Sequence, residues 1–545
     1  MIARILNLQS KTVAFGAFLL AGSALFSSVL GLFRDRLLAS QFGAGPDLDM
    51  YFAAFRIPDF LYGILIMGGL SAAFLPVFSE YFQKDEKAAW KFAGQMLNCI
   101  VLALGIIAVL LFFAIPFLIP LVVPGFSPEN QAFTASLARI MLLSPVLFGI
   151  SALLSSLLQY FNRFLAYALA PILYNVGIIL GILFLVPRFG LPGLAFGVVG
   201  GALLHMSIQV APAFSSGFRF SSFSFSESKG IMKVFALALP RTFGAGAAYL
   251  NPVVMTALAS TLTAGSIAVF SFANNLQAIP VGVIGISFSL AVFPHLSRAF
   301  SGERIEEFRT AFSSALRQIV FLALPFSALL FLLRSQIVRL VLGSGKFGWE
   351  DTRLTSAALG IFAVGILFQA LIPFFMRTFF SLHNTKIPAL SSALALLINA
   401  SFAFLFLHAL QNVNWFGSFL RSSLRIEDIA PGAIIALPLA LALGGILQCV
   451  FLALALQNRS IVFSKEIWTA FLKIVLSSFA LGIGTYLALR IFGTVFPLKT
   501  FAEVFWQTVF AVITGGLAFF TVARMLHCKE LGEFAHSFKK QFYGE

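Results

Sequence analysis

The chain has 545 residues, of which 59% are hydrophobic and 10% are charged, and its formal net charge at pH 7 is +15. This hydrophobic share, which includes 66 phenylalanines, exceeds what the core of a soluble protein needs, so the composition excludes a soluble globular protein and predicts a polytopic membrane protein. The lysines and arginines are scattered over many loops without a basic face or an aromatic platform, which excludes nucleic acid as the expected partner.

Apolar stretches follow one another along almost the whole chain. Because about 20 apolar residues cross a bilayer as a helix, we predict fourteen membrane spans and an all-α fold class. In chain order the predicted spans are 13–33, 50–78, 92–122, 131–158, 164–186, 190–214, 232–260, 265–295, 312–342, 355–381, 387–410, 430–457, 467–490 and 501–526. The connections between them are too short to bury a core of their own, so we expect no soluble domain.

Lysine and arginine residues are unequally divided between the two sides of these spans. If the N-terminus is cytoplasmic, the connections on the cytoplasmic side carry about twice as many of them as the connections on the other side. The positive-inside rule therefore predicts that both termini are cytoplasmic, and it accounts for most of the net positive charge.

Seven charged residues gather within 26 positions around the first connection, in a chain where charge is rare. They are Arg34, Asp35, Arg36, Asp47, Asp49, Arg56 and Asp59. A charge beside hydrocarbon costs about 3 kcal/mol, so such residues usually line a water-filled cavity walled by protein. We interpret the block as the wall of a transport path. Two alternatives stay open: Arg34 and Asp35 form an ion pair that only anchors a helix end, and Asp49 caps the second span.

The second span has a counterpart later in the chain. Residues 51–81 align with residues 269–299 without a gap at a constant offset of 218 residues, which places Ser71 on Ser289 and Pro76 on Pro294. The two copies are six spans apart, so both cross the membrane in the same direction. This pattern predicts two halves related by an axis along the membrane normal, with a cavity between them that opens alternately to the two sides.

The repeat also predicts how the chain is divided. Six spans make up each half, and the last two predicted spans are left over. We therefore predict an N-terminal lobe at 1–215, a C-terminal lobe at 216–458, and a third part at 459–545 that holds the last two spans and a cytoplasmic tail.

Several stretches resemble a known family. The block VLGLFRDRLLASQFGAGPDLDMYFAAFRIPDFL (29–61), followed by GGLSAAFLPVFSEY (68–81), resembles the signature region of the MurJ (MviN) family of lipid II flippases, within the multidrug/oligosaccharidyl-lipid/polysaccharide exporter superfamily. Further matches in the same order are VVPGF (122–126), YFNRF (160–164), APILYN (170–175), PVGVIGISF (280–288), FPHLS (293–297) and RTFFSLHNTKIP (377–388). The resemblance implies fourteen helices in two lobes, with the last two helices forming an apolar groove for a lipid tail.

The resemblance also implies a function. A protein of that family carries undecaprenyl-pyrophosphate-linked peptidoglycan precursor, lipid II, from the inner to the outer leaflet of the bacterial cytoplasmic membrane. Its partners would be this precursor and the membrane lipids, and its role would lie in cell-wall biogenesis and cell shape. Two alternatives stay open: an exporter of another lipid-linked saccharide or of an amphipathic drug, and a scaffold that transports nothing and binds cell-wall synthesis proteins.

The chain departs from the family at several cavity positions. The family commonly places charged residues where this chain has Ser28, the region of Tyr62, and the pair Asn274 and Asn275. A compensating charge is Arg241, which follows Pro240 inside the seventh span. The predicted substrate-binding set is Arg34, Asp35, Asp49, Arg56, Arg241, Asn274 and Asn275.

The three arginines of that set are the predicted ligands of pyrophosphate, because guanidinium forms forked, charge-assisted hydrogen bonds with phosphate. The two asparagines have an alternative role as hydrogen-bonding groups between helices. The spans show no nucleotide-binding or hydrolase motif, and the three cysteines stand at no metal-ligand spacing. We therefore expect a protein that is not an enzyme, with no metal and no cofactor, and no coupling ion can be assigned.

Overall fold

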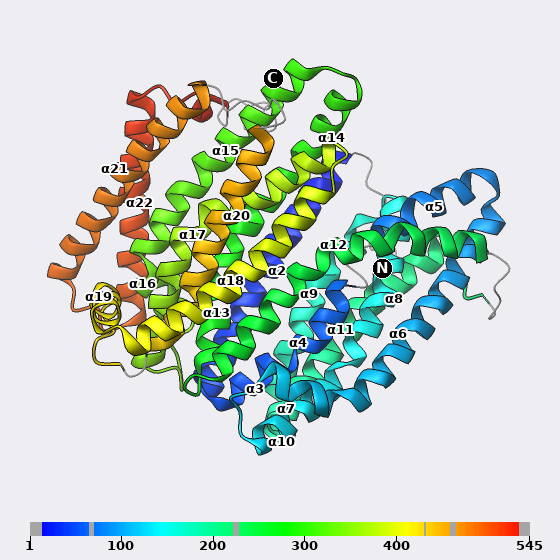
Figure 1. Ribbon diagram of the computed structural model, residues 1–545, viewed down its shortest axis with the longest axis horizontal. Coiled ribbons are helices and arrows are strands. Elements are labelled where there is room, and N and C mark those ends of the chain that lie inside the picture. Colours follow the sequence, from blue (N-terminus) through cyan, green and yellow to red (C-terminus); the bar gives the residue numbers. More distant parts are fainter. Residues whose placement is uncertain (1–12, 65–69, 222–227, 430–431, 458–464, 534–545) are drawn as a thin grey trace. The chain divides into compact units, whose positions relative to one another are not determined.

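A computed structural model describes residues 13–64, 70–221, 228–429, 432–457 and 465–533, and it leaves the side chains of 13–18, 21, 71–72 and 239–245 undescribed. Every regular element in the described residues is a helix (Figure 1). This observation confirms the predicted all-α fold class.

The chain forms two compact units, residues 1–268 and residues 269–545, called here the first and the second unit. The helices of the first unit are α2 (Val13–Phe42), α3 (Pro46–Ala54), α4 (Arg56–Tyr62), α5 (Ser71–Lys84), α6 (Glu86–Val122), α7 (Pro128–Met141), α8 (Leu143–Tyr160), α9 (Phe164–Leu180), η2 (Gly181–Leu185), α10 (Val186–Phe189), α11 (Pro192–Ser215) and α12 (Ser228–Ser260).

One helix, α13 (Ser266–Pro280), begins in the first unit and continues in the second. The other helices of the second unit are η3 (Val281–Ile286), α14 (Ser287–Ser301), α15 (Ile305–Leu332), α16 (Arg334–Val341), α17 (Trp349–Ser381), α18 (Lys386–Asn412), α19 (Asn414–Leu424), η4 (Gly432–Ile435), α20 (Ala436–Gln457), α21 (Lys465–Val495) and α22 (Phe501–Met525). The predicted three-part division at 215 and 458 rests on the repeat and stays a prediction.

Eleven helical stretches in the described part of the chain are long and apolar enough to cross a membrane, and they coincide with eleven of the predicted spans. The other three predicted spans fall on α2, on α3 to α5, and on α12. The three stretches are helical where the structure describes them. Residues 65–69 in the second predicted span are not described, and in the other two spans some side chains are not described. The chain is a multi-pass membrane protein.

The second predicted span is one apolar run in the sequence but several helices in the structure. Pro58 has no N–H to donate to the carbonyl of Ala54, and α3 ends at Ala54 before α4 begins at Arg56. A π-helical turn, η3, likewise follows Pro280 in the second unit. Because of this break, Arg56 is the first residue of a separate helix, α4, and is not part of α3.

Close packing between α9 and α11 positions part of the candidate site. Gly177 and Gly181 face Gly201 and Gly197, and a Cβ atom on Gly177 would overlap the Cα atom of Gly201. Small residues four positions apart let two membrane helices approach closely. This contact fixes α9 in the first unit, and α9 carries Asn175, a residue of the site described below.

Candidate functional site

Arg34 lies on α2 among polar partners of its own unit. Its Nε and Nη2 atoms donate to Oδ1 of Asp35 at 3.0 and 2.8 Å, and its Nη1 atom donates to Oδ1 of Asn175 at 3.1 Å. The Arg34 side chain is 21% exposed and the Asp35 side chain is 3% exposed. The ion pair is therefore held inside the helices of the first unit and bound to a second helix, which is more than a local pair at a helix end.

Asn175 completes this cluster, and the sequence analysis did not select it. Its Nδ2 atom donates to the carbonyl oxygen and the Oγ atom of Ser27 on α2, at 3.3 and 3.2 Å, and to the carbonyl oxygen of Pro171 at 3.2 Å. It is buried, so a missing hydrogen bond would be costly there. The signal available in the sequence was a single asparagine inside the apolar run of the fifth predicted span.

Arg56 is the first residue of α4 and reaches across to α12. Its Nε atom donates to Oγ1 of Thr256 at 2.7 Å, and Thr256 is fully buried. Asp59 stands one turn later on the same helix and is exposed. Arg34 and Arg56 thus both belong to the first unit, each held through part of its guanidinium by a partner on another helix.

Asp49 has a structural partner at the start of another helix. Its Oδ2 and Oδ1 atoms accept hydrogen bonds from the backbone N–H groups of Gly265 and Ala268, at 2.6 and 2.8 Å. The side chain is 2% exposed. The helix that it caps is α13, whereas the alternative expected a cap of the helix in which Asp49 itself stands; α3 instead begins after Gly45 without a side-chain cap.

Three connections of the first unit meet around this cap. Gly265 has a φ of +89°, which suits glycine, and a Cβ atom on it would overlap the carbonyl oxygen of Ala44. The N–H of Gly125 donates to Oγ of Ser260 at 3.2 Å. The Asp49 carboxylate therefore belongs to a tightly packed junction at the end of α12, and its negative charge is stabilised by the N-terminus of α13.

The remaining members of the predicted set lie elsewhere. Arg241 stands within helix α12, but its side chain lies outside the described residues. Asn274 and Asn275 lie on α13 in the second unit, where Oδ1 of Asn274 accepts a hydrogen bond of 3.1 Å from Nε2 of Gln277. The contact of Asn274 is within its own helix. The structure thus brings Arg34, Asp35, Asp49 and Arg56 together in one unit.

Two positions at which the resemblance implies charged residues have apolar or local roles in this chain. The hydroxyl of Ser28 donates to the carbonyl of Ala24 in its own helix at 2.9 Å. The ring of Tyr62 packs against Phe148, with ring centroids 5.0 Å apart. Neither position supplies a positive charge.

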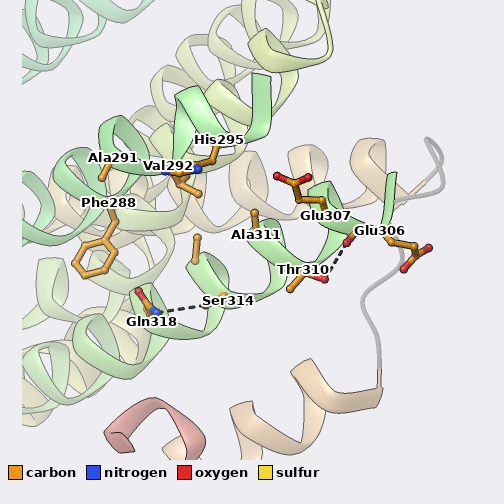
Figure 2. A pocket seen from close by; sticks show the side chains of 11 residues that line it. Phe288, Ala291, Val292, His295, Glu306, Glu307, Thr310, Ala311, Ser314 and Gln318 are labelled. Atoms are coloured by element: carbon orange, nitrogen blue, oxygen red, sulfur yellow. Dashed lines mark hydrogen bonds between the residues drawn. The ribbon is translucent and has the colours of Figure 1, made fainter. Parts of the chain in front are cut away.

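A pocket of about 760 Å³ lies in the second unit between α14 and α15 (Figure 2). Two carboxylates stand at its rim, but Glu306 pairs with Arg309 at 2.7 Å and Glu307 pairs with Arg304 at 2.8 Å. The pocket is otherwise lined by apolar and neutral polar side chains and His295. Because the rim carboxylates already have cationic partners, the pocket offers little attraction to a cation.

No group of three or more histidine, cysteine, aspartate or glutamate side chains in the described residues could hold a metal ion. His205, the one histidine inside the sixth predicted span, has a packing role: its Nδ1 atom lies 2.8 Å from Oγ of Ser151 on α8. Gln209 and Ser155 extend the same network between α8 and α11. Such networks join helices in a membrane.

Comparison with known proteins gives a consistent result. The family model "Lipid II flippase MurJ" matches residues 38–507. A probable lipid II flippase MurJ of Buchnera aphidicola subsp. Acyrthosiphon pisum is 30% identical over 380 residues, which cover 69% of this chain and 74% of the relative. The lipid II flippase MurJ of Burkholderia cenocepacia is 27% identical over 378 residues, which cover 68% of this chain and 73% of the relative.

Solved structures agree with these sequences. A lipid II flippase MurJ in an inward closed conformation superimposes with a TM-score of 0.75 at 25% identity, covering 93% of this chain and 99% of that one. An inward-facing multidrug transporter of the MATE family, in the MOP superfamily, superimposes with a TM-score of 0.65 at 15% identity, covering 80% of this chain and 95% of that one. The second likeness concerns the fold alone.

Proposed function

Because the chain belongs to the lipid II flippase MurJ family, we propose that it carries lipid II, the undecaprenyl-pyrophosphate-linked peptidoglycan precursor, from the inner to the outer leaflet of the bacterial cytoplasmic membrane. The family is one of transporters, and we propose no enzymatic reaction for this chain. The partners in this proposal are the precursor and the membrane lipids, and both termini lie in the cytoplasm.

The observation that carries the proposal is that two arginines of the first unit, Arg34 and Arg56, keep guanidinium donors available. Arg34 keeps one N–H on each of Nη1 and Nη2 beyond the hydrogen bonds to Asp35 and Asn175, and Arg56 keeps both of its terminal nitrogens beyond the bond to Thr256 within the described structure. These donors can bind phosphate oxygens in a forked arrangement. Their partners on other helices hold them in place before the cargo arrives, which reduces the cost of binding.

The mechanism in this proposal is alternating access. The polar head of the precursor crosses through the protein while the polyprenyl chain stays in lipid. The chain has no nucleotide-binding motif, so the driving force is an ion gradient, the membrane potential or the gradient of the cargo. Moving one charge through the potential supplies about 2.3 kcal/mol per 100 mV, which is enough to bias a conformational cycle.

The test is rescue of a bacterium depleted of its own lipid II flippase. Wild type should restore growth and expose lipid II at the outer leaflet. The double variant Arg34→Met with Asp35→Leu, which leaves no unpaired buried charge, should insert normally and restore neither. Arg490→Met is the matched control, because Arg490 is exposed and donates to Tyr486 of its own helix. Arg34→Lys keeps the charge but loses the fork, and we expect it to rescue only in part.

Two other outcomes would identify the alternative functions. If wild type restores growth without exposing lipid II, the protein acts as a scaffold for cell-wall synthesis proteins. If it exposes another lipid-linked saccharide, or lowers sensitivity to amphipathic drugs, the cargo assignment is wrong. The double variant Arg34→Met with Asp35→Leu separates transport from scaffolding, because a scaffold that keeps its fold does not need a guanidinium at this position.

A further inference from the structure

A groove on the first unit contains one arginine among apolar residues. The groove has a volume of about 480 Å³, lies between α6 and the junction of α7 with α8, and is lined by apolar side chains and a glycine apart from Arg139. Val109, Phe113 and Leu143 in its wall are 58%, 67% and 52% exposed. Large apolar side chains exposed on spanning helices face lipid, so the groove opens toward the bilayer.

A proline in α6 explains how Arg139 is held. Pro116 has no N–H to donate to the carbonyl of Phe112, four residues earlier. The Nε atom of Arg139 donates to that carbonyl oxygen at 2.9 Å, and the guanidinium carbon lies 4.8 Å from the centroid of the Phe112 ring. Arg139 is therefore fixed through Nε and one face of its guanidinium. In the described residues its two terminal nitrogens have no hydrogen-bonding partner and no carboxylate within ion-pair distance.

The sequence around Arg139 places it near one surface of the membrane. Helix α7 begins after Ser127, which accepts a hydrogen bond from the N–H of Asn130, and polar residues occupy its first turns. The apolar run of this span follows Arg139, at 140–158. An arginine at such a boundary keeps its alkyl chain along hydrocarbon and its guanidinium near the lipid head groups.

We propose that this groove binds an anionic glycerophospholipid of the surrounding bilayer. The lipid phosphate accepts hydrogen bonds from Nη1 and Nη2 of Arg139, and one acyl chain lies along the groove against Val109 and Leu143. At the level of the head groups the lipid phosphate is the nearest source of negative charge, and it forms charge-assisted hydrogen bonds with a guanidinium. The bound lipid joins α6 to α7 and α8. The site shares no residue with the candidate substrate site and does not depend on the proposed transport.

The experiment is native mass spectrometry of the full-length protein in detergent, titrated with phosphatidylglycerol or with phosphatidylcholine. Wild type should retain phosphatidylglycerol in preference to phosphatidylcholine. Arg139→Gln should lower the affinity for phosphatidylglycerol about fivefold, which is the effect of one arginine near an anionic head group. The variant should also show no preference for phosphatidylglycerol over phosphatidylcholine. Arg188→Gln is the matched control, because Arg188 is exposed, donates to the carbonyl of Phe184 in its own helix, and lies outside the groove.

A second variant tests the chain-binding part of the groove. A Cβ atom on Gly105 would meet no other atom within 4 Å, so the side chain of Gly105→Leu can occupy the groove without distorting the helices. This variant keeps Arg139 and should also retain less phosphatidylglycerol than wild type. If Arg139→Gln does not fold, Gly105→Leu still tests the proposal.

The proposal is overturned if Arg139→Gln and Arg188→Gln retain phosphatidylglycerol equally, or if Gly105→Leu binds as wild type does. It is also overturned if undecaprenyl phosphate, added in competition, displaces phosphatidylglycerol from wild type and is lost in Arg139→Gln. In that case the occupant of the groove is a polyprenyl lipid and not a lipid of the bilayer.

Discussion

Arg34 and Arg139 are two arginines of the same unit in opposite electrostatic situations. Arg34 lies among helices, with a buried carboxylate on the adjacent residue and an asparagine on a second helix. Arg139 lies beside exposed apolar side chains and donates to a carbonyl that a proline has left without a partner. The comparison indicates that a charge compensated by protein is part of the fold, whereas a charge left open toward lipid takes its counter-charge from the bilayer.

The largest expected effect is the loss of the counter-charge of Arg34. Breaking a buried ion pair costs about 3–5 kcal/mol, and we expect about 3 kcal/mol for Asp35→Ala because Arg34 keeps 21% exposure. The measurement is the free energy of unfolding in detergent. The double variant Arg34→Met with Asp35→Leu is the control: it should recover most of the stability but not lipid II exposure. A stable Asp35→Ala protein would contradict the view that the pair belongs to the fold.

The next effect concerns the packing that brings Asn175 to Arg34. A Cβ atom on Gly201 would lie 2.5 Å from the carbonyl oxygen of Tyr174, whereas one on Gly200 would meet nothing within 4 Å. Gly201→Ala should therefore destabilise the protein by about 2 kcal/mol through overpacking, and Gly200→Ala should stabilise it by up to about 1 kcal/mol. Thermal unfolding of the two variants in the same detergent checks this difference. Equal melting temperatures would mean that α9 and α11 are not fixed by this contact.

Removal of Asn175, the neutral partner of Arg34, should lower the free energy of unfolding by less than the two changes above. Asn175→Ala deletes the hydrogen bond to the charged Arg34, worth about 1.5–3 kcal/mol, together with the bonds to Ser27 and Pro171. We expect a loss of about 1.5 kcal/mol, because Asp35 still pairs with Arg34 and the Asn175 amide is removed along with its bonds. The variant should lower lipid II exposure in the rescue assay, since the guanidinium loses its tie to α9. Phosphatidylglycerol retention at Arg139 serves as the control and should not change. If Asn175→Ala lowers both lipid II exposure and phosphatidylglycerol retention, the site at Arg34 and the groove at Arg139 are not independent.

Arg139→Gln should change the stability of the lipid-free protein by only about 0.5 kcal/mol, as expected for a surface substitution. The difference should appear when phosphatidylglycerol is added, because only wild type binds it through the guanidinium and gains stability from the bound lipid. Melting temperatures with and without the lipid measure this gain. If the variant gains as much as wild type, Arg139 does not hold the phosphate.

The smallest effect belongs to an ion pair in water. Lys233 on α12 contacts Glu80 at the end of α5 at 2.6 Å, and the two side chains are 49% and 53% exposed. The hydrogen bond and charge of Lys233 lower the pKa of Glu80 below its ordinary value. The stability from this pair is present above the ordinary pKa and is lost as pH falls through the lowered one. Lys233→Ala should lower the stability slightly at neutral pH and remove that part of the acid dependence of unfolding, because the stability from the pair is present at neutral pH and absent in acid. An identical acid profile would contradict the assignment.

The sequence was sufficient for the class of protein and for the position of most spans. Long apolar runs imply membrane helices because no other structure satisfies the backbone in lipid at that length, and eleven of the predicted spans coincide with helices of the required length. The prediction of the second span as one helix was incomplete, since Pro58 breaks it. The proline was visible in the sequence, but its effect on the direction of Arg56 depends on where α12 lies.

The site was predicted unevenly for the same physical reason. Composition alone makes Arg34, Asp35, Asp49 and Arg56 conspicuous, because a charge beside hydrocarbon needs an explanation. It cannot say that Asp49 caps α13, more than 200 residues later, or that Asn175 binds Arg34. These partners are far apart in sequence, and periodicity and composition contain no information about which distant residues meet.

The sequence by itself therefore determined that this protein spans a membrane, because the hydrophobicity and charge of each segment decide whether that segment enters the bilayer. Tertiary structure decided which distant groups partner the charges: Asn175 for Arg34, Thr256 for Arg56, and the carbonyl of Phe112 for Arg139. Pairing depends on angstrom-scale distances between helices, and glycine contacts such as that of Gly177 with Gly201 set those distances.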